Sequence, residues 1–357
     1  MQIKSNIKNY EIKIEHDFSF VTNLIKTENA TFVIDKNVYE IYNEFFKDIP
    51  DERLIIIEAT ENNKVIEVAL NICEKITEIP AKRNSVLISF GGGIIQDITG
   101  FVANITYRGI KWIYVPTTLL AACDSCIGGK TSLNYKKFKN LLGTFYPPDM
   151  IYICSKFFLS LTERDFKSGL GEVVKFNIMS GEEGLCNIQK NLDILLSRDI
   201  DIINTFVKSS LDFKKNFIEI DEFDKNERIK LNFAHTFGHS IEVVSNYEIP
   251  HGTAVAIGMI IADRISYQRG NISEEISKNI EDILLKVIDI DVSLLKHPID
   301  DYLKAIRKDK KQTNQLLSSV LITNYGKTSE LSLVKDTTET EINDAINYFI
   351  DLYETRI

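Results

Sequence analysis

The sequence predicts an α/β protein in which an amino-terminal, Rossmann-like domain with a doubly wound sheet precedes a mainly α-helical domain. Short, almost continuously apolar runs alternate with helical stretches as far as Ser160, and amphipathic helical patterns then take over. At 357 residues the chain is also too long for one ordinary hydrophobic core. We therefore expect two domains, over residues 1–160 and 161–357.

The composition, with 44% hydrophobic and 26% charged residues, is typical of a soluble globular protein. No apolar run approaches the length of a membrane span, and residues 1–18 alternate apolar and charged side chains, which predicts a first strand and not a signal peptide. Five cysteines, an odd number, indicate reduced thiols and a cytoplasmic location. The net charge of -9 argues against nucleic acid as a partner, whereas a small anion could still bind at a local cluster of cations.

Five apolar runs are expected to form the parallel strands of the first domain. Each is too short for a helix and is almost continuously apolar, as strands buried on both faces are. The runs cover residues 31–34, 53–57, 85–90, 112–115 and 150–154, and helices are expected between them over residues 62–79 and 96–107.

Gly91, Gly92 and Gly93 directly follow the third of these runs. Glycines at such a turn let the backbone approach a pyrophosphate at a helix amino terminus, but a tight strand-to-helix turn explains them equally well. The dinucleotide pattern GxGxxG is absent. Asp97 could cap backbone N–H groups or could bind the ribose or nicotinamide of a dinucleotide, and the spacing alone leaves both open.

The connection over residues 115–148 is richer in functional groups than a plain loop, with Asp124, Lys130, Lys139 and Asn140. Gly128 and Gly129 precede Lys130 in a Gly-Gly-Lys-Thr turn that looks like a phosphate cradle, although the full P-loop pattern GxxxxGK[ST] is not met. Cys123 and Cys126 form a CxxC pair. Because no second CxxC is present, we interpret them as two unpaired thiols.

Three of the five histidines lie within residues 228–251. Apolar side chains predict a buried helix over residues 229–244, with His235 and His239 four apart on one face. A polar break over residues 246–250 then leads to His251, which opens a second helix and could fold back towards His235. With a carboxylate from elsewhere, two imidazoles would make the His2Glu set of a catalytic zinc site. Core histidines bonded to backbone carbonyls are the alternative.

Glu172 and Lys175 are three residues apart within a largely apolar helical segment. A carboxylate in such surroundings needs a partner, which could be this lysine or a metal ion. Lys308, Lys310 and Lys311 are typical of a solvated face. Short strands are expected over residues 320–323 and 331–334, and a closing helix over residues 338–353.

Taken together, these motifs resemble the 3-dehydroquinate synthase family of the sugar phosphate cyclases. The resemblance extends from residue 31 to residue 311. The matching stretches, in the family's order and spacing, are GGGIIQD, TYRGIKWIYVPTTLLAACDSCIGGKTSLN, KNLLGTFYPP, GLGEVVKF, DEFDKNER, LNFAHTFGHSIE, HGTAVAIGM and DKK.

The resemblance implies a role for each matching residue. It implies zinc ligands at Glu172, His235 and His251. It implies NAD contacts at Asp35, Glu61, Lys64, Gly91, Gly92, Gly93, Asp97, Thr117, Thr118, Lys130 and Lys139. Phosphate contacts are implied at Lys130, Asn140, Asn232, His239 and either Lys310 or Lys311, with Arg108 supplied by the partner subunit of a homodimer. Arg228 and Lys214 match the pair that holds a carboxylate, Asp124 and Lys175 match groups around ring hydroxyls, and Asp224 matches a further catalytic position.

The implied enzyme is a carbon-oxygen lyase of the shikimate pathway of aromatic amino acid biosynthesis, with NAD and Zn2+ or Co2+ as cofactors. It would convert 3-deoxy-D-arabino-heptulosonate 7-phosphate to 3-dehydroquinate and phosphate. The implied steps are transient oxidation by NAD, β-elimination of phosphate with His239 or the phosphate as base, re-reduction, and intramolecular aldol closure.

The sequence leaves three alternative functions open. A related cyclase would act on a sugar phosphate without a carboxylate, such as a heptulose 7-phosphate or glucose 6-phosphate. A metal- and NAD-dependent polyol dehydrogenase would release NADH. A non-catalytic scaffold would bind the cofactor alone. Arg228 and Lys214 favour the carboxylated substrate, because bidentate arginine suits that group.

Five positions depart from the family's usual pattern and bear on efficiency and substrate identity more than on fold. They are Gln96, Cys126, Phe138, Asp224 and Ala234, where Gly, Ser, Gly, Glu and Gly are usual. Gln96 predicts a tighter pyrophosphate turn or weaker NAD binding.

Overall fold

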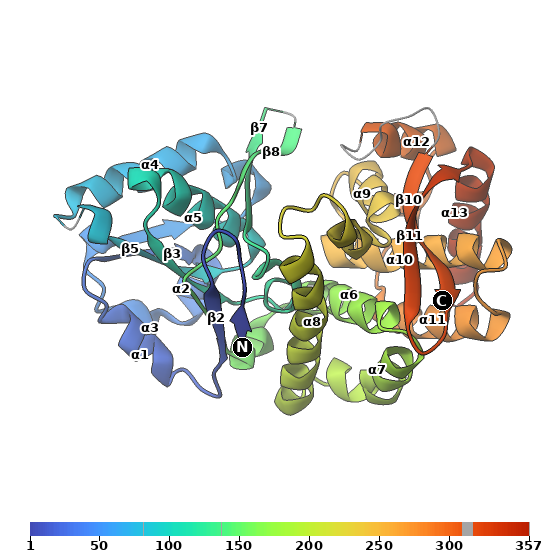
Figure 1. Cartoon of the computed structure of the whole chain (residues 1–357), viewed down its shortest axis with the longest axis horizontal. Coiled ribbons are helices and arrows are strands. Elements are labelled where there is room, and N and C mark those ends of the chain that lie inside the picture. The colour runs from blue at the N-terminus through green and yellow to red at the C-terminus, as the bar shows by residue number, and fades with distance from the viewer. Residues whose placement is uncertain (81, 137, 309–316, 357) are drawn as a thin grey trace. The chain divides into compact units, whose positions relative to one another are not determined.

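The computed structural model describes residues 1–80, 82–136, 138–308 and 317–356. The chain divides into two compact units, Met1–Leu161 and Thr162–Ile357. Unit 1 contains a mostly parallel sheet and unit 2 is mainly helical, so the predicted fold class is confirmed (Figure 1). Within the described ranges, no helix combines the length and the apolar character needed to cross a membrane.

The sheet of unit 1 has seven strands in the order β1-β2-β9-β6-β5-β3-β4, and every neighbouring pair is parallel except β1 and β2. The five predicted apolar runs form β3, β4, β5, β6 and β9, and the amino-terminal segment forms two strands where one was expected. The bounds are β1 Gln2–Ile3, β2 Tyr10–Ile14, β3 Ala30–Asp35, β4 Leu54–Ile57, β5 Val86–Gly91, β6 Lys111–Pro116 and β9 Met150–Ile153.

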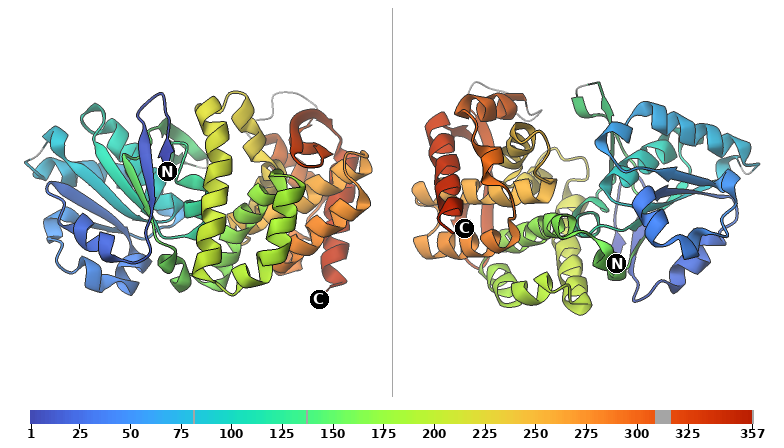
Figure 2. Two further views of the ribbon diagram at one scale, coloured as in Figure 1. Left: turned by 60° about the horizontal axis from the view of Figure 1, so that its bottom comes forward. Right: turned by 180° about the vertical axis from the view of Figure 1, so that it is seen from behind.

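Helices cover both faces of this sheet, as a doubly wound fold requires. The helices are α1 Ser19–Ile25, α2 Lys36–Ile41, α3 Asn43–Phe46, α4 Ile66–Glu78 and α5 Gly93–Ile105. In Figure 1, α4 and α5 lie on one side of the sheet and α1 and α3 on the other, and Figure 2 shows the same layers from two further directions. The α5 helix begins at Gly93, three residues before its predicted start, because Gly92 is already its extended cap.

The connection over residues 115–148 contains an antiparallel hairpin that the sequence reading missed. Its strands are β7 Lys130–Tyr135 and β8 Phe138–Phe145, and β7 packs against α5. Thr131 and Leu133 are buried whereas Lys130 is exposed. This alternation of buried and exposed side chains with a period of two is the sequence pattern of a strand and could have indicated β7. The Gly-Gly-Lys-Thr turn therefore leads into a strand and lacks the following helix of a P-loop.

Unit 2 is built around α10, which packs against α6, α9, α11, α13 and the strand β10. Its helices are α6 Glu163–Met179, α7 Glu182–Leu196, α8 Ile200–Ile220, α9 His235–Val244, α10 His251–Gln268, α11 Glu274–Val287, α12 Ile299–Lys308 and α13 Glu339–Glu354. A hairpin of β10 Leu317–Tyr325 and β11 Ser329–Thr337 completes the unit. The two short strands and the closing helix expected from the sequence are confirmed.

The predicted continuous helix over residues 229–244 is wrong in its first half. A 3-10 helix, Glu227–Asn232, is followed by a break at Phe233 and Ala234 before α9 begins. Ala234 has a φ of 68°, in the left-handed region. This conformation costs an L-residue about 1–2 kcal/mol. Because alanine has the highest helix propensity, an alanine at position 234 favours a continuous helix, and the apolar pattern did not indicate the break.

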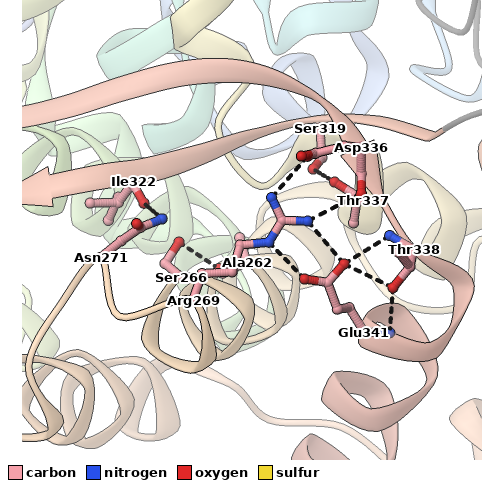
Figure 3. Close-up of polar contacts among 10 residues, drawn as sticks. All are labelled: Ala262, Ser266, Arg269, Asn271, Ser319, Ile322, Asp336, Thr337, Thr338 and Glu341. Atoms are coloured by element: carbon pink, nitrogen blue, oxygen red, sulfur yellow. Dashed lines mark hydrogen bonds and ion pairs between the residues drawn. The ribbon is translucent and has the colours of Figure 1, made fainter.

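Arg269 joins the end of α10 to the start of α13 in unit 2 (Figure 3). Its guanidinium donates from Nε to Glu341 Oε1 at 2.6 Å, from Nη2 to Glu341 Oε2 at 2.9 Å, and from Nη1 to Asp336 Oδ1 at 2.9 Å. Glu341 also forms a capping box with Thr338 at the first turn of α13. Bidentate geometry makes this pair stronger than an ordinary exposed ion pair.

Replacing Glu341 with Gln is expected to lower the free energy of unfolding by about 1–2 kcal/mol at neutral pH. The bonds from Arg269 lower the pKa of Glu341 from 4.5 to about 2, although burial opposes them. A depressed carboxyl pKa stabilises the fold above pH 4.5, and this contribution is lost as the pH falls towards 2.

The difference between wild type and Glu341→Gln in urea unfolding should therefore shrink between pH 4.5 and pH 2. Glu354→Gln, which removes a more exposed ion pair with Lys296, is the matched control and should change stability little at any pH. A difference for Glu341→Gln that stays constant with pH would contradict this account.

Candidate active site

Two glycines bring α6 and α10 into direct backbone contact within unit 2. A Cβ atom on Gly171 would lie 2.1 Å from the carbonyl oxygen of Gly252, and one on Gly252 would lie 1.7 Å from the carbonyl oxygen of Ser168. Only glycine permits this approach. The neighbouring residues Glu172 and His251 consequently face each other, with Glu172 Oε1 3.5 Å from His251 Nε2.

The break before α9 orients the second imidazole. His235 is the first residue of α9, and its Nδ1 lies 3.0 Å from the carbonyl oxygen of Phe233. Its Nε2 lies 3.6 Å from Glu172 Oε1. The His251 ring is centred 5.4 Å from that of His235, which is the fold-back predicted from the sequence, and His239 lies at the same centroid distance from His235 on the α9 face.

The geometry around Glu172 fits a metal ion. Neighbouring ligands of a tetrahedral zinc lie about 3.4 Å apart when the metal–ligand bonds are about 2.1 Å, close to the separations of 3.5 and 3.6 Å found here. The Glu172 carboxylate is fully buried, and among the described residues neither of its oxygens accepts a hydrogen bond of normal geometry. Its charge is met by Lys175, whose Nζ lies 2.5 Å from Oε2.

Neighbouring charges shift the pKa values of both Glu172 and His251. Burial acts to raise the pKa of Glu172, but Lys175 and His251 outweigh it and hold the pKa below its usual range. Burial acts to lower the pKa of His251, but Glu242 and Glu172 raise it above the ordinary value of 6.5. A metal ligand must be the neutral imidazole, so metal binding at His251 would release a proton.

Of the other predicted residues of unit 2, Lys214 lies in α8 and Arg228 in the 3-10 helix Glu227–Asn232. Arg228 and Lys214 are both buried, and the Arg228 guanidinium donates through Nη1 to the carbonyl oxygen of Glu222. Asp221, which the sequence reading missed, accepts the backbone N–H groups of residues 225, 226 and 228 at 3.0, 2.6 and 3.1 Å. It thereby shapes the loop that presents Arg228.

Asp224 and Asn232 lie at the two ends of that region. Asp224 has a φ of 57° within the loop, and Asn232 donates from Nδ2 to the carbonyl oxygen of Ile229 at 3.0 Å. Lys310 and Lys311 lie outside the described residues.

In unit 1, the predicted cofactor residues gather where parallel strands end. The strand order β4-β3-β5-β6 places a topological switch point between β3 and β5, the usual ligand crevice of an open α/β sheet. Asp35 ends β3 and caps α2 by accepting from the Asn37 N–H at 2.9 Å.

On the other side of the switch point, Gly91 ends β5, and Gly92 and Gly93 lead into α5. Thr117 and Thr118 follow the adjacent strand β6, and Thr117 donates its N–H to the Gly91 carbonyl oxygen at 3.0 Å.

A second cluster in unit 1 joins α5 to the hairpin. Lys64 Nζ lies 2.5 Å from Asp97 Oδ2 and donates to Asn140 Oδ1 at 2.7 Å. Ser132 Oγ lies 3.0 and 2.8 Å from the same two acceptors and donates its single proton to one of them at a time. Burial raises the pKa of Asp97 above its ordinary value, although Lys64 acts in the opposite direction. The Asp97 carboxylate thus pairs with side chains of this cluster.

The cluster continues to Glu61 and Lys139. Asn134 donates from Nδ2 to Glu61 Oε2 at 2.7 Å, and its Oδ1 accepts the Asn140 N–H at 2.9 Å. Lys139 Nζ lies 3.6 Å from Glu61 Oε1. Ser132 and Asn134 were missed by the sequence reading because their place in the alternation of β7 was not recognised.

The remaining predicted residues of unit 1 are Lys130, Asp124 and Arg108. Lys130 is exposed at the start of β7, Asp124 lies in the π-helical turn Ala121–Ser125, and Arg108 is exposed in the 3-10 helix Thr106–Arg108. Cys123 and Cys126 form no disulfide, as predicted, and their thiols donate to the carbonyl oxygens of Leu120 and Ala122 at 3.5 and 3.3 Å.

The side chain of Gln96 bonds to the π-helical turn, and its backbone N–H donates to the Gly92 carbonyl oxygen at 3.1 Å. Its Nε2 donates to the Ser125 carbonyl oxygen at 2.7 Å, and its Oε1 accepts from Ser125 Oγ at 2.7 Å. Because Gln96 is buried, Gln96→Ala is expected to lower the free energy of unfolding by about 2–3 kcal/mol through two lost hydrogen bonds. Urea unfolding measures the effect, with the exposed Gln189→Ala as control. A loss no larger than in the control would contradict the role of this contact.

The fold and the candidate site define a class: an α/β unit with a ligand crevice at its strand ends, followed by a helical unit with the His2Glu donor set of catalytic zinc sites. The similarity of the chain to known families specifies this class further. The family model described as 3-dehydroquinate synthase N-terminal matches residues 54–168, and the one described as 3-dehydroquinate synthase C-terminal matches residues 169–312. The chain belongs to the 3-dehydroquinate synthase family, and the resemblance found in the sequence is confirmed.

Similarity to an individual relative also supports this family membership. The 3-dehydroquinate synthase of Dictyoglomus thermophilum is 36% identical over 350 residues, which are 97% of this chain and 97% of the relative. Two solved structures are similar at 22% identity, which shows the fold alone. They are 2-epi-5-epi-valiolone synthase from Streptomyces hygroscopicus, with a TM-score of 0.83 over 96% of this chain and 97% of that chain, and 2-deoxy-scyllo-inosose synthase, with 0.81 over 98% and 99%.

Proposed function

We propose that this chain is a 3-dehydroquinate synthase that converts 3-deoxy-D-arabino-heptulosonate 7-phosphate to 3-dehydroquinate and phosphate. The observation that carries the proposal is the buried Glu172 carboxylate with imidazole nitrogens at 3.5 and 3.6 Å, in a chain 36% identical to a named synthase over nearly its whole length. The enzyme is a carbon-oxygen lyase and belongs to the shikimate pathway.

Glu172, His235 and His251 are the residues we assign to a Zn2+ or Co2+ ion. The two similar solved structures support this choice, since one was solved with NAD+ and Zn2+ and the other with carbaglucose-6-phosphate, NAD+ and Co2+. The ion would act as a Lewis acid on a substrate oxygen. Lys175, paired with Glu172 at 2.5 Å, keeps that carboxylate ionised and retains further N–H donors that could orient a ring hydroxyl.

NAD is assigned to unit 1, where it would accept a hydride and later return it, so that no net oxidation results. Asp35 and the glycines 91–93 lie on either side of the switch point, which supports a dinucleotide there. The other residues that we assign to NAD are Glu61, Lys64, Asp97, Thr117, Thr118, Lys130 and Lys139.

Substrate contacts are assigned by charge and family position. Arg228 and Lys214, both buried cations, would hold the substrate carboxylate. His239, on the same α9 face as His235, would take the proton next to the departing phosphate on an imidazole nitrogen. Further assignments are Asp124 near a ring hydroxyl, Asp224 as a catalytic carboxylate, and Lys130, Asn140, Asn232, Arg108 and one of Lys310 and Lys311 as phosphate contacts.

We further propose a homodimer in which Arg108 serves the partner subunit, because that side chain is exposed on a short 3-10 helix. A cytoplasmic location is supported by the five cysteines, none of which forms a disulfide, since a reducing compartment keeps thiols in this state.

A phosphate-release assay with catalytic NAD and zinc tests the substrate. The carboxylated heptulosonate 7-phosphate, a heptulose 7-phosphate and glucose 6-phosphate are offered separately, and NADH absorbance is recorded. Release from the first alone, without net NADH, is the expected result. Release from another sugar alone would replace the proposal with a related cyclase, and net NADH without phosphate would replace it with a polyol dehydrogenase.

A further inference from the structure

Glu242 faces His251 across the break between α9 and α10. It lies seven residues after His235 and three after His239, so all three side chains project from one side of α9. Glu242 Oε2 lies 3.1 Å from His251 Nδ1. The Glu242 side chain is only 15% exposed, so water competes weakly for this contact.

This contact decides which nitrogen of His251 is available. When Nδ1 carries the hydrogen and donates it to Glu242, the lone pair of the neutral ring is on Nε2. Nε2 is the atom that lies 3.5 Å from Glu172 Oε1. The carboxylate therefore fixes both the tautomer and the orientation that a metal shared with Glu172 would require.

The imidazoles of His235 and His251 differ in the group that contacts the Nδ1 atom. The Nδ1 atom of His235 contacts a neutral backbone carbonyl at 3.0 Å, whereas that of His251 contacts a carboxylate. A carboxylate partner makes the imidazole a stronger donor to a metal than a carbonyl does. The His251 side chain is also the more exposed of the two, at 33% against 12% for His235. Because fewer packing contacts hold its ring, its orientation depends more on a hydrogen bond.

We propose that Glu242 is a positioning residue that orients His251 for metal binding, an inference that rests on the metal site of the proposed function. The main competing arrangement uses Glu242 as a ligand itself, because one donor atom each of His239, Glu242 and His251 also lie within 4.8 Å of one another. That arrangement would leave the fully buried Glu172 carboxylate outside the metal site. The observations favour Glu172 as the ligand and Glu242 behind His251.

The test measures Co2+ affinity and the visible spectrum of the Co2+-loaded full chain, for wild type and Glu242→Gln. Gln keeps the size of the side chain but loses its charge. We expect the dissociation constant to rise about 10–100-fold while the spectrum keeps the wild-type form, because the ligands themselves are unchanged. Glu248→Gln, an exposed carboxylate three residues before His251, is the matched control and should bind as wild type does.

Three outcomes would overturn the inference. A Glu242→Gln affinity equal to that of Glu248→Gln would remove the positioning role. Weakened binding with a changed spectrum of the bound Co2+ in both Glu242→Gln and His239→Asn would make Glu242 a ligand. A fall in the unfolding midpoint of the metal-free protein with unchanged Co2+ affinity would make the contact merely structural.

The result can be separated from that of the proposed function. If wild type binds Co2+ and Glu242→Gln binds it more weakly, the inference stands even when no sugar phosphate is turned over. If wild type binds no Co2+, both the inference and the metal assignment are overturned.

Discussion

Glu172→Gln is expected to abolish stoichiometric metal binding and phosphate release. The substitution removes the only negative charge among the three assigned ligands and leaves two neutral imidazoles. It also removes the partner of Lys175, whose side chain is 1% exposed, so an unpaired ammonium would remain in the core of unit 2. Breaking a buried ion pair from one side costs about 3–5 kcal/mol, and we expect a lower urea midpoint as well as lost metal.

The double variant Glu172→Gln/Lys175→Met separates these two effects. It removes both charges and fills the space with a flexible apolar side chain, so most of the lost stability should return while metal binding stays absent. Metal content after dialysis, phosphate release and urea unfolding are measured on the same preparations. Full activity in a metal-depleted Glu172→Gln protein would disprove the metal assignment.

Arg228→Ala is expected to raise KM for the carboxylated substrate by about 10–100-fold, since hydrogen bonds to a charged group contribute about 1.5–3 kcal/mol. NAD affinity should change far less, because the residues assigned to NAD all belong to unit 1. Arg228→Lys should recover only part of the loss, as lysine cannot reproduce the bidentate geometry. Steady-state kinetics measures KM for the substrate, and NAD titration measures the dissociation constant for NAD.

Lys230→Ala provides the control for Arg228. Lys230 is a neighbouring cation whose partly exposed side chain pairs with Glu227 at 2.6 Å, and its loss should affect neither ligand. Equal losses of substrate and NAD affinity in Arg228→Ala would show that Arg228 supports the fold of its loop and does not read the carboxylate.

The sequence predicted much of the candidate metal site because the relevant signals are local or compositional. The four-residue spacing of His235 and His239 places both on one helix face, and the break after α9 predicts the return of His251. Glu242 could have been found by the same helical register. It was missed because a glutamate in a helix usually signals a solvated face and not a partner for a distant ring.

Other features depend on contacts that no local pattern contains. The left-handed Ala234 is held by tertiary packing, since its carbonyl oxygen would lie 2.5 Å from a Cβ atom on Gly258. The contact of Gly171 with Gly252 joins helices far apart in the sequence. The β7–β8 hairpin could have been recognised from alternation, but its many polar side chains favoured a loop interpretation.

The most direct test of the central claim counts phosphate released per NAD. The full chain is incubated with zinc, excess 3-deoxy-D-arabino-heptulosonate 7-phosphate and an amount of NAD far below that of the substrate, and phosphate and NADH are followed together. The account predicts many phosphates per NAD, one carbocyclic product per phosphate and no accumulation of NADH. Phosphate release that stops at the amount of NAD, with NADH accumulating in step, would contradict a cyclase that regenerates its cofactor.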